Sequence, residues 1–335
     1  MKNLSTINNL SISGNVLIVL PKFIGDVVNC TPTIGILKNL YPQKQIYVLA
    51  RPHLVDILAR DETIHVISDE RFNKNQPTSL LGQAKKLKEK NIGLAIILRN
   101  SLSEALLCYA ACIKFRVGYA QNGRSPLLTH KFKLNKNHHY IYRYCRLVNE
   151  SHGEPFSQFP DTNLHYKKSN LIINKSESKN IGIYFGGTNK GHRHYPVDLA
   201  IDALQKINAE YKSCHFYLVG DPTEKKDSEL LTSQLQQDTI HITNLVGKTS
   251  LIEMVDVIAS LDLLISIDSG PMHIAAAVNV PFIAVVGLGT SPWSTVAPKQ
   301  KNYIALVANG QQLKESEFIR DIKPEQISHA VTQLI

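Results

Sequence analysis

The sequence has no apolar run approaching the roughly 20 residues that a helix needs to cross a bilayer. The longest early run, Val16–Pro21, is far too short. The first residues, Met1–Ser13, contain neither a basic segment nor a long apolar segment. We therefore expect no signal peptide and no membrane-spanning helix.

Cysteine is also scarce, with five residues in a chain of 335. They are too few and too scattered for a disulfide framework, which favours the reducing cytoplasm. Cys108 and Cys112 are four residues apart and could share one face of a helix. We interpret this pair as core packing rather than metal ligation.

Acidic residues are outnumbered, and the formal net charge is +9. Lysine and arginine are dense at Lys85–Lys90, Lys131–Lys136 and Lys167–Lys168. No nucleic-acid-binding motif accompanies them, so we expect no nucleic-acid partner. Two interpretations stay open for these segments: solvated surfaces, or contacts with anionic lipid or phosphorylated ligands.

The length predicts two domains, because single cores rarely grow past about 250–300 residues. Short β-branched runs alternate with amphipathic segments, which is typical of parallel sheets built from strand–helix–strand units. The predicted strands are Val16–Leu20, Gln45–Ala50, His65–Ser68, Leu94–Leu98 and Arg116–Tyr119, then Ile181–Phe185, His215–Gly220, Leu263–Ile267 and Phe282–Gly287. The predicted helices are Pro32–Tyr41, Ser79–Lys90, Ser101–Cys112, Pro196–Ala209, Ser250–Leu261 and Met272–Val278.

The strand–helix series breaks at the polar stretch Tyr166–Asn180, which we predict to be a linker. The expected domains are residues 1–170 and 171–335, and the last helix either stays with the second domain or packs back on the first. The predicted fold class is α/β, with two facing, Rossmann-like, doubly wound domains. Ligands of open α/β sheets bind at the carboxyl ends of the strands, so we expect the site in a cleft between the domains.

The first motif is Pro21–Val28 (PKFIGDVV), followed by Thr31-Pro32, where the first strand turns into a helix. Gly25 allows the backbone to approach a ligand closely. Asp26 then stands near a helix N-terminus at the carboxyl end of the sheet. Two interpretations remain for Asp26: an N-cap, which is a common role for such an aspartate, or a catalytic group.

The second motif is Phe185–Pro196 (FGGTNKGHRHYP), which follows the first strand of the second domain. Its backbone N–H groups, the Thr188 hydroxyl and the charge of Lys190 or Arg193 suit phosphate binding. The alternative is a basic surface loop.

The third motif is Ser266–Ala276 (SIDSGPMHIAA), in which a strand ends and a helix begins near Pro271. Ser269 and Gly270 place backbone N–H groups at a helix N-terminus, which is an anion-binding arrangement. A capped strand–helix turn would use the same aspartate and serine, but it would not explain His273 one turn later.

These motifs, in this order and with Asn244–Leu251 (NLVGKTSL) between the second and the third, closely resemble glycosyltransferase family 9, the lipopolysaccharide heptosyltransferases. The resemblance covers about Val16 to Pro298. Leu98–Ser101, Arg116–Tyr119 and Gly123-Arg124 make the chain more similar to the second inner-core heptosyltransferase than to the first.

The resemblance implies a GT-B fold whose first domain binds the acceptor and whose second domain binds ADP-heptose. It implies an inverting, metal-independent transfer to the lipopolysaccharide core on lipid A, without a cofactor. The expected location is the cytoplasm, and peripheral contact with the cytoplasmic face of the inner membrane stays open. The absence of any Asp-x-Asp pair agrees with metal independence. Asp26 takes the position of the general base. The positions implied for donor binding are Thr188, Lys190, Arg193, Asp268, Ser269, Gly270, Pro271 and His273; those for acceptor binding are Lys22, Asn100 and Arg124.

The sequence departs from the family pattern in two places. Arg193–Pro196 reads RHYP instead of the usual KRWP, and Gly287–Thr290 reads GLGT where the family usually has GPT. The second departure leaves open another nucleotide sugar as donor. A nucleotide-sugar epimerase of similar two-domain build is the other alternative. We expect adenine–ribose contacts near the end of His215–Gly220 and around Glu224.

Overall fold

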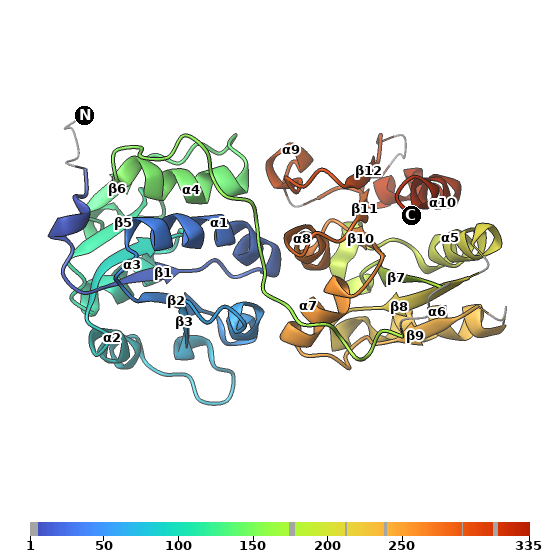
Figure 1. Cartoon of the computed structure of the whole chain (residues 1–335), viewed down its shortest axis with the longest axis horizontal. Coiled ribbons are helices and arrows are strands. Elements are labelled where there is room, and N and C mark those ends of the chain that lie inside the picture. Colours follow the sequence, from blue (N-terminus) through green and yellow to red (C-terminus); the bar gives the residue numbers. More distant parts are fainter. Residues whose placement is uncertain (1–5, 174–177, 212, 238–239, 290, 311–313) are drawn as a thin grey trace. The chain divides into compact units, whose positions relative to one another are not determined.

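The computed structural model describes residues 6–173, 178–211, 213–237, 240–289, 291–310 and 314–335. The chain divides into two compact units, Met1–Asn163 and Leu164–Ile335. Each unit contains a six-stranded sheet in which every recorded strand pair is parallel (Figure 1). No helix in the described ranges is long and apolar enough to cross a membrane.

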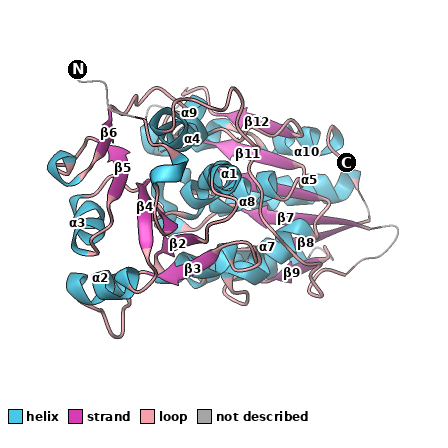
Figure 2. Cartoon of the chain, turned by 60° about the vertical axis from the view of Figure 1, so that its left-hand side comes forward, coloured by secondary structure: helices cyan, strands magenta, loops and turns pink. Residues whose placement is uncertain are grey.

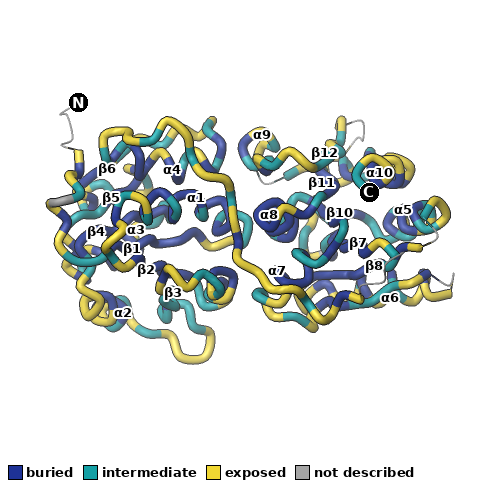
Figure 3. Tube along the Cα trace, in the orientation of Figure 1, coloured by how far each residue is buried: buried dark blue, intermediate teal, exposed yellow. Residues whose placement is uncertain are grey.

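The sheet of the first unit has the strand order β3-β2-β1-β4-β5-β6. Its strands are β1 (Asn15–Val19), β2 (Ile46–Ala50), β3 (His65–Ser68), β4 (Ile92–Ile97), β5 (Phe115–Tyr119) and β6 (His130–Phe132), and its helices are α1 (Ile24–Leu40), α2 (Leu80–Lys88), α3 (Leu102–Ala110) and α4 (Tyr140–Ser151). The central strands β1 and β4 are almost wholly buried, whereas the edge strand β3 is not (Figure 3).

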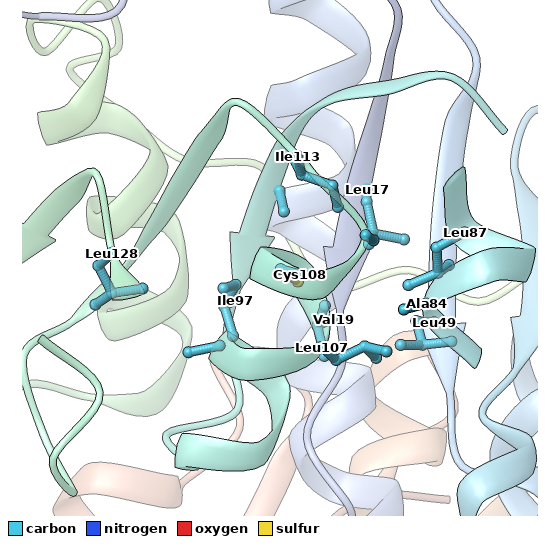
Figure 4. Packing of buried hydrophobic residues seen from close by; sticks show 13 residues of the cluster. Leu17, Val19, Leu49, Ala84, Leu87, Ile97, Leu107, Cys108, Ile113 and Leu128 are labelled. Carbon is cyan, nitrogen blue, oxygen red and sulfur yellow. The ribbon is translucent and has the colours of Figure 1, made fainter. Parts of the chain in front are cut away.

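Both faces of this sheet are covered, which explains why its central strands read as continuous apolar runs. Alternate residues of β1, Leu17 and Val19, point into a core cluster with α2 and α3 (Figure 4). Helices α1 and α4 pack against each other. Cys108 lies in the core cluster, but Cys112 is exposed beyond the end of α3, so the prediction of core packing is wrong for Cys112.

The first helix begins earlier than predicted, at Ile24 instead of Pro32. Pro32 lies inside α1, where its ring nitrogen cannot donate to the carbonyl four residues earlier, that of Val28. The Thr31 hydroxyl donates to this carbonyl at 2.8 Å and takes the place of the missing backbone bond. The longer helix includes Asp26 in its first turn.

The sheet of the second unit has the order β12-β11-β10-β7-β8-β9. Its strands are β7 (Lys179–Tyr184), β8 (Cys214–Leu218), β9 (Ile242–Asn244), β10 (Leu263–Ile267), β11 (Phe282–Val286) and β12 (Tyr303–Val307). Its helices are α5 (Val197–Glu210), α6 (Lys225–Gln237), α7 (Leu251–Ala259), α8 (Gly270–Ala277), α9 (Trp293–Val296) and α10 (Pro324–Thr332) (Figure 2). The last helix packs on α5 of the same unit, where the Ser328 hydroxyl donates to Glu210 at 2.7 Å.

The stretch predicted as a linker, Tyr166–Asn180, contacts the second unit over its first half. The backbone N–H groups of Lys167 and Ile173 donate to Asp256 at 2.8 Å and to the Tyr217 hydroxyl at 3.0 Å. Residues 174–177 of this stretch lie outside the described ranges, and β7 already begins at Lys179.

Several elements were not predicted. The missed strands β6, β9 and β12 are short or only partly buried, and β6 and β9 span three residues each. The missed helices include α6, whose sequence is mostly polar. Helix α4 had a clear apolar stripe that the prediction overlooked, with Ile141, Tyr144, Cys145 and Val148 all buried.

Candidate active site

In the first unit, the strand order reverses direction between β1 and β4. Such a switch point is where ligands bind in open α/β sheets, at the carboxyl ends of the strands. Lys22 and Asp26 follow β1, and Asn100 follows β4. Lys22 in the loop after β1, Asp26 in the first turn of α1 and Asn100 in the loop after β4 thus follow the two strands that flank the switch point.

Asp26 is the third residue of α1 and does not cap it. The N-cap is Phe23, and no side chain makes a capping hydrogen bond there. Burial raises the pKa of the Asp26 carboxyl from 3.8 to about 6. A hydrogen bond from the Tyr144 hydroxyl and the charges of Arg143 and Lys22 act in the opposite direction and keep the rise from being larger.

A carboxyl group with this pKa has the properties of a general base. At neutral pH it is mostly ionised, yet it holds a proton more tightly than an ordinary aspartate, as efficient proton transfer requires. The hydrogen bond from Tyr144 of α4 fixes one side of the Asp26 carboxylate. Tyr144 itself is buried, and its ring meets that of Tyr140 edge-on at 6.2 Å between centroids. Sequence reasoning missed Tyr144 because it missed α4.

Lys22 is exposed, and its ammonium lies 4.7 Å from the centre of the Phe23 ring. The side chain of His53 donates to the Lys22 carbonyl, and burial lowers the pKa of this histidine. His53 comes shortly after β2, so a third strand end contributes to the surroundings of Lys22.

Arg124 is fully buried, with 0% of its surface exposed. Its guanidinium donates to the Tyr119 carbonyl at 2.7 Å, to the Arg99 carbonyl at 2.6 Å and to the Asn100 side-chain oxygen at 2.6 Å. Burial lowers its pKa to about 10. Arg124 therefore holds the loop after β4, including the Asn100 side chain, from the buried side of that loop.

Three arginines surround the ring of Phe72. The guanidinium carbons of Arg51, Arg71 and Arg99 lie 3.1, 5.2 and 5.3 Å from the ring centre. Arg51 follows β2 directly and Arg99 follows β4, so both stand at the carboxyl end of the sheet.

Two carboxylates only partly balance this arginine cluster. Arg71 forms an ion pair with Asp69 at 2.7 Å, and Glu104 is shared by Arg71 at 3.4 Å and Arg99 at 3.2 Å. The Nε of Arg51 is buried and has no hydrogen-bond partner among the described residues. Burial and then the charge of Arg99 lower the pKa of Arg51. Sequence reasoning did not single out this cluster, although an arginine directly after a strand was a usable signal.

In the second unit, the strand order reverses between β7 and β10. The glycine-rich loop follows β7, and Asp268 follows β10. Arg193 Nη1 donates to the Asp268 carbonyl at 3.2 Å, which joins two motifs that are 75 residues apart. Gly186 has a φ of 71°, a conformation that glycine adopts without strain.

Asp268 is half-buried. Burial raises its pKa, and the charge of Arg193 acts against the rise. A Cβ atom at Gly289 would lie 3.0 Å from Asp268 Oδ2, so the segment that departs from the family pattern passes beside Asp268. Thr290 of that segment lies outside the described residues.

Helix α8 begins at Gly270 with Ser269 as its N-cap, and no side chain caps it. The Ser269 hydroxyl is directed to Tyr184 instead. Pro271 has no N–H group, so the N–H groups of Gly270 and Met272 remain to meet an anion at this end of the helix. His273 is buried in the first turn of the helix, with 6% of its surface exposed.

Lys190 is held by two acidic residues. Its ammonium lies 3.2 Å from Glu224 and 3.6 Å from Asp221. Glu224 is buried and also accepts a hydrogen bond from the Tyr184 hydroxyl at 2.7 Å. The side chain of Thr188 lies outside the described part of the structure.

A small cavity of ≈ 30 Å³ lies beside this network. Its lining includes Tyr184, Leu218, Val219, Glu224 and Val246. It therefore opens next to the end of β8, in the region where adenine–ribose contacts were predicted. Among the described residues, no group of three His, Cys, Asp or Glu side chains could hold a metal ion.

Comparison with known proteins agrees with the predicted family. Residues 81–322 match glycosyltransferase family 9 (heptosyltransferase). The chain is 28% identical over 353 residues to lipooligosaccharide heptosyltransferase 2 of Haemophilus influenzae, covering 96% of this chain and 99% of that protein.

Two solved structures share the fold. Escherichia coli ADP-heptose lps heptosyltransferase II has a TM-score of 0.81 and 22% identity, covering 96% of this chain and 98% of the other. The glycosyl transferase family 9 protein of Veillonella parvula has a TM-score of 0.82 and 18% identity, covering 99% of both chains. The predicted α/β fold class, with two doubly wound domains of the GT-B type, is confirmed.

Proposed function

The chain belongs to glycosyltransferase family 9, and on this premise we propose that it transfers heptose from ADP-heptose to the inner core of lipopolysaccharide, with inversion and without a metal ion. One observation carries the proposal at the level of residues. Asp26, with a pKa of about 6, stands at the switch point of the first unit, while an uncapped helix start with Arg193 nearby stands at that of the second. Asp26 is suited to activating a hydroxyl of the acceptor, and the helix start with Arg193 is suited to holding the diphosphate of the donor.

In the proposed mechanism, the first unit binds the acceptor and Asp26 is the general base. The acceptor oxygen forms a bond to the anomeric carbon of heptose while its proton passes to the Asp26 carboxylate. The bond from that carbon to the phosphate oxygen breaks, and its electron pair leaves with ADP. Attack on the face opposite the leaving group inverts the anomeric configuration. General-base catalysis of this kind contributes about 10²–10⁴-fold to the rate.

The second unit binds the donor in this proposal. The charge that develops on the leaving ADP is stabilised by Arg193, by the N–H groups at the start of α8 and by the hydroxyl of Thr188. Asp268 binds hydroxyl groups of the heptose, and Ser269, Gly270, Pro271 and His273 shape the turn around the diphosphate. Lys190, held between Glu224 and Asp221, positions the glycine-rich loop.

On the acceptor side, we assign direct contacts to Lys22 and Asn100 and give Arg124 the role of positioning Asn100, because Arg124 is fully buried. Because the arginines around Phe72 carry more charge than their carboxylate partners balance, we also assign acceptor contacts to Arg51 and Arg99. A phosphate or carboxylate of the acceptor would balance that charge and satisfy the arginines.

Replacing Arg51 with Gln should therefore raise the KM for the acceptor by roughly 10- to 100-fold, since hydrogen bonds to charged groups contribute about 1.5–3 kcal/mol. The KM for the donor should not change. Steady-state kinetics with each substrate varied in turn measures both values. Arg146→Gln is the matched control, because Arg146 is an exposed arginine of the same unit that pairs with Glu150 at 2.8 Å. Equal effects on both substrates would assign Arg51 a purely structural role.

The test of the proposed function measures ADP release from ADP-heptose with and without deacylated inner-core acceptor, in the presence of EDTA. We expect release that depends on acceptor and survives EDTA, and a product whose anomeric configuration, read by NMR, is opposite to that of the donor. Loss of activity in EDTA would refute metal independence. Conversion of the donor without acceptor would favour the epimerase, and activity restricted to other nucleotide sugars would refute the heptose assignment.

A further inference from the structure

Helix α3 carries a second apolar face that the core does not use. Leu102, Leu106 and Tyr109 are 48%, 40% and 56% exposed. Their spacing of four and then three residues places them within a narrow stripe along one side of the helix. The opposite side of α3 is already packed, with Ala105 and Cys108 in the core cluster. The exposed stripe thus does not contribute to the core of this unit.

Helix α2 lies next to α3 and carries a stripe with the same spacing. Leu81 is 72% exposed, and Lys85 and Lys88 follow it after four and seven residues. Both helices pack on each other and on the same core cluster, to which α2 contributes Ala84 and Leu87 (Figure 4). Both stripes are therefore on the sides of the helices turned away from the sheet. We call them together the α2–α3 surface.

The α2–α3 surface is cationic at its margins. Glu104 of α3 is buried and paired with arginines, which leaves Glu89 as the exposed acidic side chain between residues 80 and 110. The guanidinium of Arg116 lies 5.4 Å from the centre of the Tyr109 ring. Lys85 and Lys88 are the basic side chains of the α2 stripe itself, and Lys86, Lys90 and Lys114 are exposed at positions close to the two helices in sequence.

We propose that the α2–α3 surface docks on an anionic lipid bilayer. Leucine and tyrosine side chains projecting from helices that lie along the surface enter the boundary between headgroups and acyl chains, while lysines around them are attracted to anionic headgroups. A protein partner fits the observations less well, because protein interfaces are depleted in lysine. Of the two interpretations of Lys85–Lys90 that the sequence left open, the exposed leucines beside these lysines favour contact with lipid.

Docking would bring the enzyme to a lipid-anchored acceptor, and this benefit rests on the proposed function. Binding of the chain to lipid can be measured whether or not the chain is an active transferase. The experiment is flotation of the full chain with vesicles of phosphatidylethanolamine and phosphatidylglycerol, compared with vesicles of phosphatidylcholine alone. We expect binding to the anionic vesicles that weakens at high salt, and little binding to the neutral ones.

Two double variants separate the apolar from the cationic contribution: Leu102→Gln with Leu106→Gln, and Lys85→Gln with Lys88→Gln. Each should weaken vesicle binding by about tenfold or more. The matched control is Leu230→Gln with Lys225→Gln on α6, where Leu230 is 50% exposed and Lys225 is also exposed. It should bind as the unaltered chain does. Thermal unfolding checks that all variants fold.

Transfer to deacylated acceptor should be unchanged in the α2–α3 variants, whereas transfer to acceptor embedded in vesicles should fall. This contrast keeps the test separate from that of the proposed function, since an inactive chain could still bind vesicles. Absence of binding to anionic vesicles would overturn the proposal. So would binding that the α2–α3 variants retain or that the α6 control loses equally.

Discussion

Replacing Asp26 with Asn should lower turnover by about 10²–10⁴-fold, the usual contribution of a general base. Asn retains the size of the side chain and can still accept the hydrogen bond from Tyr144. It cannot accept the proton of the acceptor hydroxyl. Binding of ADP-heptose, measured by calorimetry, should be unchanged, because the donor contacts are assigned to the second unit. A variant that kept near-wild-type turnover would remove Asp26 from the mechanism.

The same substitution should make the protein more stable. The folded-state pKa of Asp26 is raised from 3.8 to about 6, so the folded protein holds this proton more tightly than the unfolded chain does. Ionisation in the folded state therefore reduces stability as the pH rises from about 4 to about 6, and the whole penalty is present above that. Asn removes a penalty on the order of 1–3 kcal/mol at neutral pH. Thermal unfolding at pH 7 and at pH 4 should show the gain at the higher pH and little gain at the lower one.

Asp61 offers a control of opposite sign in the same unit. Its side chain pairs with Lys38 at 2.8 Å, and hydrogen bonds from Lys38 and Thr63 outweigh burial and lower its pKa. A lowered folded-state pKa contributes stability above the unfolded value, so Asp61→Asn should destabilise the protein at pH 7. Turnover should be little changed. Stabilisation together with lost activity is then specific to Asp26 and is not expected from a damaged core.

The activity of the unaltered enzyme should follow the ionisation of Asp26. Because the proposed base works as the carboxylate, kcat/KM should fall as the pH drops below about 6. Tyr144→Phe removes a hydrogen bond that lowers the pKa of Asp26, so this acid limb should move to higher pH. An acid limb near pH 4 in the unaltered enzyme would contradict the assignment.

The sequence was sufficient for the fold class because the central strands are continuous apolar runs and each is followed by a helix. It was also sufficient to place Asp26 and Asn100 after β1 and β4, since the carboxyl ends of parallel strands share one edge of the sheet. The position of Asp26 inside the first turn of α1 was harder to predict from the sequence. Pro32 suggested a later start for the helix, and only the Thr31 hydroxyl bonded to the Val28 carbonyl shows how α1 accommodates it.

Burial was the main property that the sequence did not reveal. An arginine in a loop, such as Arg124, is ordinarily expected at the surface, but its guanidinium is held inside by four hydrogen bonds to backbone and side-chain oxygens up to 27 residues away. The contact of Arg51 with Phe72 joins the end of β2 to the turn after β3. Such contacts depend on tertiary packing, which neither spacing nor composition reports.

The second large effect is expected at Arg193, where replacement by Gln should lower kcat/KM by about 10²–10³-fold. Arg193 is anchored at 3.2 Å on the Asp268 carbonyl, so its charge is held at the switch point of the second unit before the donor arrives. In the proposed mechanism that charge meets the negative charge developing on ADP, a contribution that Gln cannot supply. Both the donor KM and kcat should change, and Arg193→Lys should recover only part of the loss because a single ammonium lacks the planar fork of donors.

The matched control for Arg193 is Arg320→Gln. Arg320 is also an arginine of the second unit, and it pairs with the exposed Asp198 at 3.2 Å. Because such surface pairs contribute about 0–1 kcal/mol, this variant should keep near-wild-type kinetics. If Arg193→Gln behaved like the control, the N–H groups at the start of α8 would have to stabilise the leaving group without the charge of Arg193. Substitutions that disturb this helix start, such as Gly270→Pro, which also removes an N–H group, should then carry the larger effect.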